Sequence, residues 1–327
     1  MRAFPALLGF SVTFGQSAGP MHMSLFKKWC GAFLALLALT GALPAAGVNF
    51  GWGMAPPVGT IFLHDVVIGR GGGRALHADV AYPPHLFGRT PAIIFIHGGG
   101  WSAGSYHDAP LAEFAKAGYF AASIEYRLSG EAKWPAQIRD CNLGVRWLRA
   151  NAAKYKVSPD RIAVWGESAG GHLAACVATM GGAKDLEGDG GYPGVSSAVQ
   201  AAVIYYGPTD LTTPDMTHNL GDALAALFGA PYAQNPDLWK SASPLYTIKA
   251  GDAPMFLAHG DADQLVPVTQ STIFDAALAK AGVPHQLLII KNAGHVFASP
   301  TGIAIHPSPA QINQAAFAFL APYLKRK

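Results

Sequence analysis

The chain has 327 residues, of which 50% are apolar and 13% are charged. Basic residues exceed acidic ones by three, and this excess lies within the first 46 residues as Arg2, Lys27 and Lys28, leaving 20 residues of each sign in the remainder. Proteins that bind nucleic acid usually show a basic surplus or patch, so the neutral remainder argues against a nucleic-acid partner.

Residues 1–46 have the pattern of an export signal. The pair Lys27-Lys28 precedes an apolar stretch over residues 29–39, and small residues follow up to a cleavage position near Ala45 or Ala46. We therefore expect a signal peptide within residues 1–46 and a mature protein that is secreted or periplasmic. The apolar stretch is shorter than the roughly 20 residues of a membrane span, so no stable span is expected in the mature chain. An uncleaved anchor and a translation start at Met21 or Met23 remain alternatives.

From residue 60 onward, apolar runs of strand length alternate with helical patterns. Strands are predicted near residues 61–68, 75–82, 92–96, 119–125, 162–165, 199–206, 254–259 and 286–290. Helices are predicted over residues 109–117, 135–154, 169–180, 269–281 and 309–324. Because parallel strands need crossover connections, this alternation predicts an α/β fold. We expect one domain over residues 47–327 with an eight-stranded, mostly parallel sheet flanked by helices. Residues 208–248 are expected to form a small cap insertion.

A glycine-rich loop follows the predicted strand over residues 92–96. It reads His97-Gly98-Gly99-Gly100-Trp101. Residues without side chains let backbone N–H groups approach a developing oxyanion, which such groups stabilise by several kcal/mol. An isolated glycine triplet is more often a flexible turn, but a strand before it and a candidate nucleophile after it favour an oxyanion loop. Trp101 adjoins this loop and is the predicted substrate-pocket residue.

A second glycine motif marks the candidate nucleophile. The apolar run over residues 161–165 is followed by Gly166-Glu167-Ser168-Ala169-Gly170. A serine on a sharp strand-to-helix turn is exposed to a base, and glycines on either side allow the strand and the helix to pack closely. Ser168 is therefore the candidate nucleophile.

The candidate acid and base follow the last two predicted strands. Asp261 and Asp263 both lie just after the strand over residues 254–259, and we favour Asp263 because it is further into the loop and can turn back toward an imidazole. His295 lies on the loop after the strand over residues 286–290. A histidine in this place can take the serine proton, while the carboxylate fixes its tautomer.

These motifs together resemble the α/β-hydrolase esterases and lipases, including hormone-sensitive-lipase-like and bacterial feruloyl-esterase-like enzymes. The similarity runs from about residue 61 to the C-terminus and includes the loop at 97–101, the elbow at 166–172, and the segments Tyr126-Arg127-Leu128, Trp134-Pro135-Ala136-Gln137, Tyr206-Gly207-Pro208-Thr209-Asp210 and His259-Gly260 with Asp263 and Val266-Pro267. The resemblance implies a triad of Ser168, Asp263 and His295, with oxyanion donors at Gly99, Gly100 and Ala169. It also implies a serine carboxylic-ester hydrolase for small or aromatic esters, among them feruloyl or acetyl esters of plant polysaccharide.

Two alternative functions remain open. One is amide hydrolysis by the same fold, as in an arylformamidase or an oligopeptidase-like enzyme. The other is a non-catalytic binding protein on a hydrolase scaffold, although the triad pattern shows no gap. The sequence has no metal-binding motif or nucleotide motif, so neither a metal nor a cofactor is predicted. Cys141 and Cys176 lie in predicted helices, and whether they pair is left open, as is the oligomeric state.

Overall fold

The computed structural model describes residues 58–86 and 89–324. The predicted signal peptide in residues 1–46 lies outside this part of the chain and stays a prediction. Among the helices that the model describes, none has both the length and the hydropathy needed to cross a membrane.

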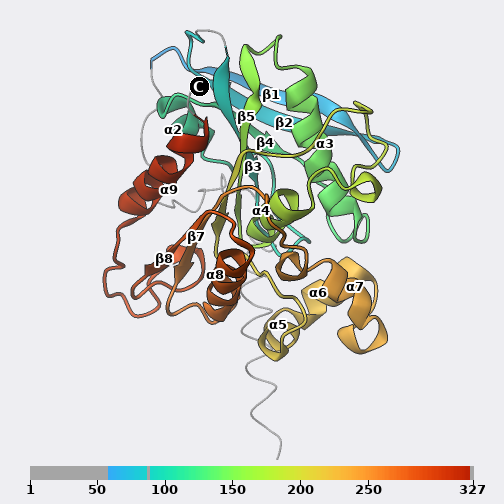
Figure 1. Cartoon of the computed structure of the whole chain (residues 1–327), viewed down its shortest axis with the longest axis vertical. Coiled ribbons are helices and arrows are strands. Elements are labelled where there is room, and N and C mark those ends of the chain that lie inside the picture. The colour runs from blue at the N-terminus through green and yellow to red at the C-terminus, as the bar shows by residue number, and fades with distance from the viewer. Residues whose placement is uncertain (1–57, 87–88, 325–327) are drawn as a thin grey trace, which may run out of the picture. The chain divides into compact units, whose positions relative to one another are not determined.

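The described residues form one eight-stranded sheet with the strand order β1-β2-β4-β3-β5-β6-β7-β8 (Figure 1). The pairs β1·β2 and β2·β4 are antiparallel, and all other neighbours are parallel. This architecture confirms the predicted fold class. The strands are β1 (Ile61–Gly71), β2 (Arg74–Tyr82), β3 (Thr90–Ile96), β4 (Phe120–Ile124), β5 (Val157–Glu167), β6 (Ala201–Tyr205), β7 (Met255–Gly260) and β8 (His285–Ile290).

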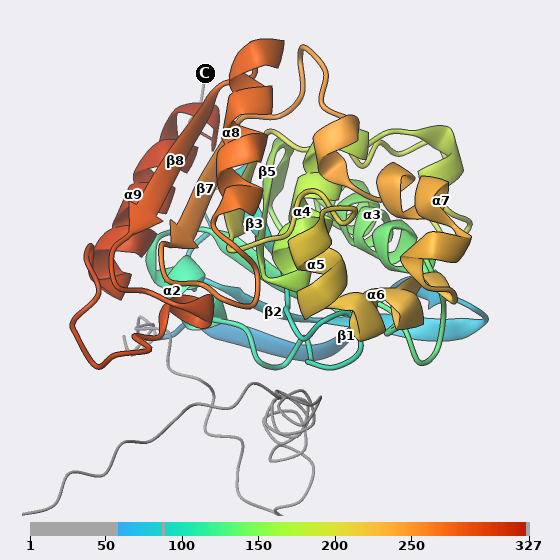
Figure 2. The same ribbon diagram turned by 90° about the horizontal axis from the view of Figure 1, so that it is seen from below.

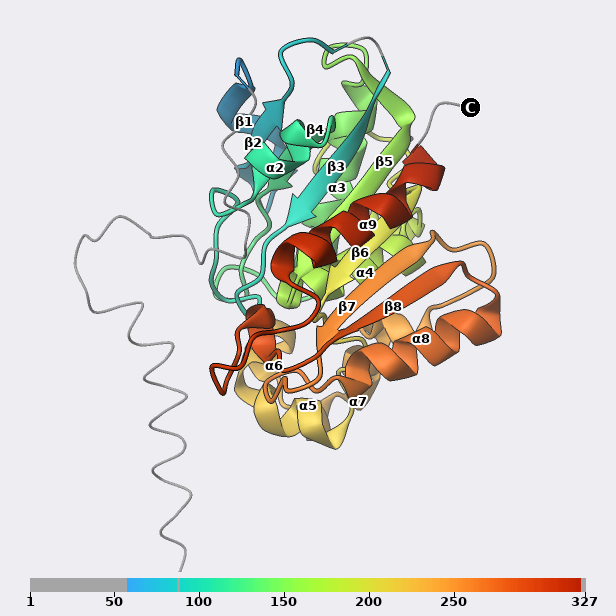
Figure 3. The ribbon, with the colours of Figure 1, turned by 90° about the vertical axis from the view of Figure 1, so that its left-hand side faces the viewer.

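Helices cover both faces of the sheet, and their buried residues contribute to a separate hydrophobic core on each face. Helices α3, α4 and α8 pack on one face, whereas α2 and α9 pack on the other; Figure 3 shows α9 crossing in front of β5 and β6. The central strands are buried on both sides. In β3, Ile94 lies in the core on the face covered by α3, α4 and α8, and Ile93 lies in the core on the face covered by α2 and α9. The helices are α2 (Leu111–Lys116), α3 (Ala136–Ala150), α4 (Ala169–Met180), α5 (Pro214–Asn219), α6 (Gly221–Phe228), α7 (Pro236–Ser241), α8 (Thr269–Ala281) and α9 (Pro309–Leu324).

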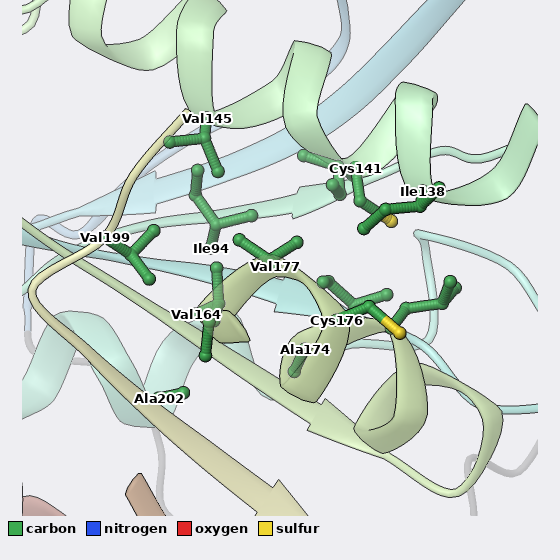
Figure 4. Close-up of a cluster of buried hydrophobic side chains, with 14 of the residues drawn as sticks. Ile94, Ile138, Cys141, Val145, Val164, Ala174, Cys176, Val177, Val199 and Ala202 are labelled. Carbon is green, nitrogen blue, oxygen red and sulfur yellow. The ribbon is translucent and has the colours of Figure 1, made fainter. Parts of the chain in front are cut away.

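The core beneath α3 and α4 joins the elbow helix to the sheet. Val177 of α4 packs among Val145 of α3, Ile94 of β3 and Val164 of β5 (Figure 4). Cys141 and Cys176 lie in this core as free, buried thiols, so they do not form a disulfide in the structure. The helix that carries Ser168 at its start is thus held on a densely packed layer.

One predicted helix and the strand after it have different boundaries in the structure. The helix predicted over residues 135–154 ends at Ala150, and turns over residues 151–156 lead into β5, which begins five residues earlier than predicted. Residues 208–248, the predicted cap, contain the short helices α5, α6 and α7, which lie next to one another beside α4 (Figure 2).

Candidate active site

Ser168 lies at the turn between β5 and α4. Its φ is 54° and its ψ is −120°, a conformation that L-residues with side chains rarely adopt. The neighbouring glycines make the turn possible, because a Cβ on Gly166 would lie 2.0 Å from the carbonyl oxygen of Gly170, and one on Gly170 would lie 2.0 Å from that of Ile96. The Ser168 N–H donates to the Tyr205 carbonyl at 2.9 Å. The predicted elbow therefore has the strained geometry that exposes a serine hydroxyl.

The three predicted triad residues meet at the carboxyl ends of the strands. The Ser168 Oγ lies 2.9 Å from Nε2 of His295, and Nδ1 of His295 lies 2.7 Å from Oδ2 of Asp263. Ser168 and His295 are partly exposed, whereas Asp263 is buried. Nδ1 must carry the proton that Asp263 accepts, which leaves the Nε2 lone pair facing the serine hydroxyl.

The Asp263 carboxylate is held by three N–H groups, and it also faces Nε2 of His259, which lies 2.8 Å from the Val266 carbonyl oxygen. Oδ1 accepts from the backbone N–H groups of Leu265 and Val266 at 2.9 and 3.0 Å, and Oδ2 faces Nε2 of the buried His259 at 3.3 Å as well as His295. Burial raises the pKa of Asp263, but the hydrogen bonds from His259 and His295 outweigh burial and lower it to about 2. The carboxylate is therefore ionised at any pH where His295 can act as a base.

The competing aspartate has a different environment. Asp261 accepts a hydrogen bond from the Asn292 backbone N–H at 2.8 Å and pairs with the Lys291 Nζ at 3.2 Å. These contacts fasten the loop that leads to His295. The structure thus places Asp263, and not Asp261, against the imidazole.

Close contacts fix the position of the glycine loop beside the candidate nucleophile. A Cβ on Gly98 would lie 3.3 Å from the Ser168 Cβ, and one on Gly99, where φ is 111°, would lie 2.2 Å from the Ala103 carbonyl oxygen. His97 is buried and stacks on Tyr126 with ring centroids 4.3 Å apart. Ala169 is the first residue of α4, so its N–H is one of those that the helix leaves unpaired. The loop and the helix start therefore bring backbone donors to the side of Ser168.

Trp101 does not offer a surface to a ligand in this structure. Its φ is 58°, its side chain is 1% exposed, and Nε1 donates to Nδ1 of the fully buried His172 at 3.2 Å. Nε2 of His172 then donates to the Ala242 carbonyl at 2.8 Å, just after α7. The ring supports the glycine loop from inside the core, so this placement does not support the predicted contact of Trp101 with substrate.

Glu167, the residue before the nucleophile, is a buried acid that the sequence analysis did not single out. Its Oε2 accepts a hydrogen bond from the Tyr206 hydroxyl at 3.1 Å, and the Tyr206 ring lies against His295. Burial raises the pKa of Glu167 to about 7, although the hydrogen bond from Tyr206 lowers it somewhat. The carboxyl group is therefore neutral over much of the acidic range.

The buried Glu167 is expected to make stability fall with rising pH. Between pH 4.5 and 7 the folded protein binds this proton more tightly than the unfolded chain does, so the free energy of unfolding decreases across that window. Glu167→Gln cannot ionise, so its stability should not fall in this way. We expect the free energy of unfolding of the variant, relative to that of the wild type, to increase by up to about 3 kcal/mol from pH 5 to pH 8. Urea unfolding at both pH values measures this. Glu131→Gln is the control: hydrogen bonding to Arg74 lowers the pKa of Glu131, so its effect should not change over this range. If Glu167→Gln changed the free energy of unfolding equally at both pH values, the raised pKa of Glu167 would be contradicted.

A pocket of about 360 Å³ borders the glycine loop. Its wall includes His97, which begins the loop, and Ser102 and Gly104, which follow it, together with the charged side chains of Arg74 and Glu131. The Arg74 Nε donates to Glu131 at 2.7 Å. Polar groups thus line this pocket, whose wall includes neither Ser168 nor the predicted oxyanion donors Gly99, Gly100 and Ala169.

A comparison with protein families finds a match between residues 78–278 and the BD-FAE model. The chain belongs to the BD-FAE family. As a BD-FAE protein it resembles the esterase LipQ of Mycobacterium tuberculosis, to which it is 35% identical over 69% of this chain and 55% of LipQ. The chain spans about half the length of the curated relatives it matches.

Two similar solved structures are also named esterases. A truncated carbohydrate esterase from gut microbiota is 27% identical, covers 84% of this chain and all of its own, and superposes with a TM-score of 0.70. The propionate-bound esterase Est2 of Thermogutta terrifontis is 28% identical, covers 82% of this chain and 97% of its own, with a TM-score of 0.66. These matches show that the BD-FAE chain shares its fold with solved proteins that are named esterases.

Proposed function

We propose that the protein is a serine carboxylic-ester hydrolase that works through an acyl-enzyme. The observation that carries this proposal is a pair of linked hydrogen bonds, one between Ser168 Oγ and His295 Nε2 and the other between His295 Nδ1 and Asp263. The serine lies on a strained strand-to-helix turn. An ionised carboxylate, an imidazole whose Nε2 faces the serine and a partly exposed hydroxyl in this order suit nucleophilic attack on an ester.

The proposed reaction begins when the Ser168 Oγ attacks the ester carbonyl carbon while His295 Nε2 takes the hydroxyl proton. The negative charge that develops on the carbonyl oxygen is stabilised by backbone N–H groups, for which Gly99, Gly100 and Ala169 are the candidates. The tetrahedral intermediate then breaks its bond to the alcohol oxygen, which leaves with the proton from His295. A water molecule, activated by the same imidazole, releases the acid and restores the serine.

The proposed substrates are small or aromatic esters, with acetyl or feruloyl esters of plant polysaccharide as candidates. Three observations support a short acyl group on a polar alcohol. One solved relative is named a carbohydrate esterase, and another is described as bound to propionate. The pocket beside the glycine loop is lined by Arg74, Glu125 and Glu131, whose charged groups can hydrogen-bond to hydroxyls.

The test is a substrate panel with the full-length protein. We expect turnover of p-nitrophenyl acetate and of acetylated xylan or methyl ferulate, with kcat/KM for the preferred ester at least about tenfold above that for an aryl formamide such as N-formylkynurenine. A preference for the formamide would favour amide hydrolysis instead. A folded protein that turns over no member of the panel would favour the non-catalytic alternative.

A further inference from the structure

A second group of chemically reactive side chains lies on the β1–β2 edge of the sheet. It consists of His64 in β1, Asp79 in β2 and His107 in the segment between β3 and α2. The Asp79 Oδ2 lies 3.0 Å from Nδ1 of His64 and 2.8 Å from Nδ1 of His107. All three potential ligand atoms are within 4.8 Å of one another. Residues separated by as many as 43 positions thus present two imidazole nitrogens and one carboxylate oxygen to the same point.

An irregularity in the strand pairing creates this arrangement. Leu63 pairs with Val80 and Val66 with Ala78, so His64 and Asp65 together lie opposite Asp79. Such a bulge re-aims side chains on the bulged strand. The Asp65 backbone N–H donates to the Asp79 Oδ1 at 3.0 Å, which holds the carboxylate from the side opposite the two imidazoles. Oδ2 is therefore left to the histidines.

The burial of the three groups suits a cation with open coordination positions. The Asp79 side chain is 5% exposed, whereas those of His64 and His107 are 67% and 50% exposed. A buried carboxylate benefits from a compensating positive charge, and two exposed imidazoles can rotate to improve their geometry. Around a tetrahedral Zn²⁺ with bonds of about 2.1 Å, ligand atoms lie about 3.4 Å apart. The Asp79 oxygen lies 3.0 and 2.8 Å from the two histidine nitrogens, and all three atoms lie within 4.8 Å of one another, so small side-chain movements would bring them to that spacing.

A second carboxylate, that of Asp65, lies near the other ring nitrogen of His107. Nε2 of His107 lies 3.8 Å from Oδ1 of Asp65, and that oxygen also accepts a hydrogen bond from the Tyr106 hydroxyl at 2.6 Å. Histidines that bind a metal through one nitrogen usually direct the other N–H to a carboxylate, which fixes the ring and its tautomer. If His107 binds the ion through Nδ1, Asp65 is the carboxylate toward which its Nε2–H points.

We propose that His64, Asp79 and His107 form a binding site for a divalent first-row transition metal ion, with Zn²⁺ as the representative ion. Two imidazoles and one carboxylate are ligands that such ions accept, and water would complete the coordination shell. Binding requires each Nδ1 to give up the proton that it now donates to Asp79, either to Nε2 of the same ring or to solvent. The ion would join β1 and β2 to the segment that follows the glycine loop, so it is expected to raise the temperature of unfolding.

The test uses the full-length protein stripped of metals with EDTA. Equilibrium dialysis and calorimetry with Zn²⁺ are expected to show one saturable site that His64→Gln and His107→Gln each weaken by at least about tenfold. Zn²⁺ should raise the unfolding temperature of the wild type more than that of either variant. His218→Gln removes an exposed histidine of α5 and serves as the matched control, with binding unchanged.

A measurement on the wild type alone decides the case if a variant fails to fold. Diethyl pyrocarbonate modifies accessible imidazoles, and its sites can be mapped by peptide mass spectrometry. We expect Zn²⁺ to protect His64 and His107 but not His218. Zn²⁺ binding that is unaffected by either substitution, or labelling of His64 and His107 that is the same with and without Zn²⁺, would overturn the proposal.

Discussion

Ser168→Ala is expected to lower kcat for p-nitrophenyl acetate by at least about 10³-fold. The substitution removes the only atom that the proposed reaction acylates, while the backbone of the elbow and its hydrogen bond to Tyr205 do not depend on the hydroxyl. KM and the unfolding temperature should therefore change far less than kcat. Steady-state kinetics on the purified variant measure the effect.

A matched serine substitution controls for general damage. Ser241→Ala, in the exposed part of α7, removes a hydroxyl that donates only to the Leu238 carbonyl, and its activity should remain within about twofold of the wild type. A fluorophosphonate should label the wild type on Ser168 and fail to label Ser168→Ala. Retention of esterase activity by Ser168→Ala would remove the proposed nucleophile.

Asp263→Asn is expected to lower kcat/KM by about 10³- to 10⁴-fold. The backbone N–H groups of Leu265 and Val266 donate to Oδ1, so the amide oxygen of the new side chain must occupy that position. Its NH₂ group then takes the place of Oδ2 and faces Nδ1 of His295 as a donor. The imidazole would hold its proton on Nε2, where it cannot accept the proton of Ser168.

The neighbouring aspartate supplies the control for this loss. Asp261→Asn keeps an oxygen that can accept from the Asn292 N–H and does not touch His295, so it should retain most of the activity. Both variants are compared with wild type by kcat/KM across pH and by thermal unfolding. An equal loss in Asp261→Asn and Asp263→Asn would contradict the assignment of the acid.

The parts of the site that local patterns determine were predictable from the sequence. Gly166 and Gly170 flank Ser168 because carbonyl groups approach the places where their Cβ atoms would be, and this requirement appears directly as a motif. The order of Ser168, Asp263 and His295 was readable because each follows a strand in a parallel sheet, and such strands end at the same edge. The choice between Asp261 and Asp263, made from loop position alone, agrees with the observed contacts.

Contacts that depend on side-chain direction or on strand register could not be predicted. Trp101 adjoins the glycine loop in sequence, but its left-handed backbone directs the ring into the core. His259 is the last residue but one of β7, and only the turn of the following loop brings Asp263 back toward it. His64, Asp79 and His107 meet because of a bulge in the β1–β2 pairing, which no pattern in the sequence indicates.

The buried imidazole of His172 restricts how the cap segment can vary. Its Nδ1 accepts a hydrogen bond from the Trp101 Nε1–H, which requires the imidazole proton to be on Nε2. The Nε2–H in turn donates to the Ala242 carbonyl oxygen. Burial lowers the pKa of His172 to about 4, so the ring remains neutral under ordinary conditions. An exchange of residues 208–248 that aims at new ester specificity must therefore conserve a carbonyl oxygen at the position of Ala242. Otherwise the imidazole loses the partner that keeps it an acceptor for Trp101, and the glycine loop over residues 97–101 loses the hydrogen bond that holds its last residue in the core.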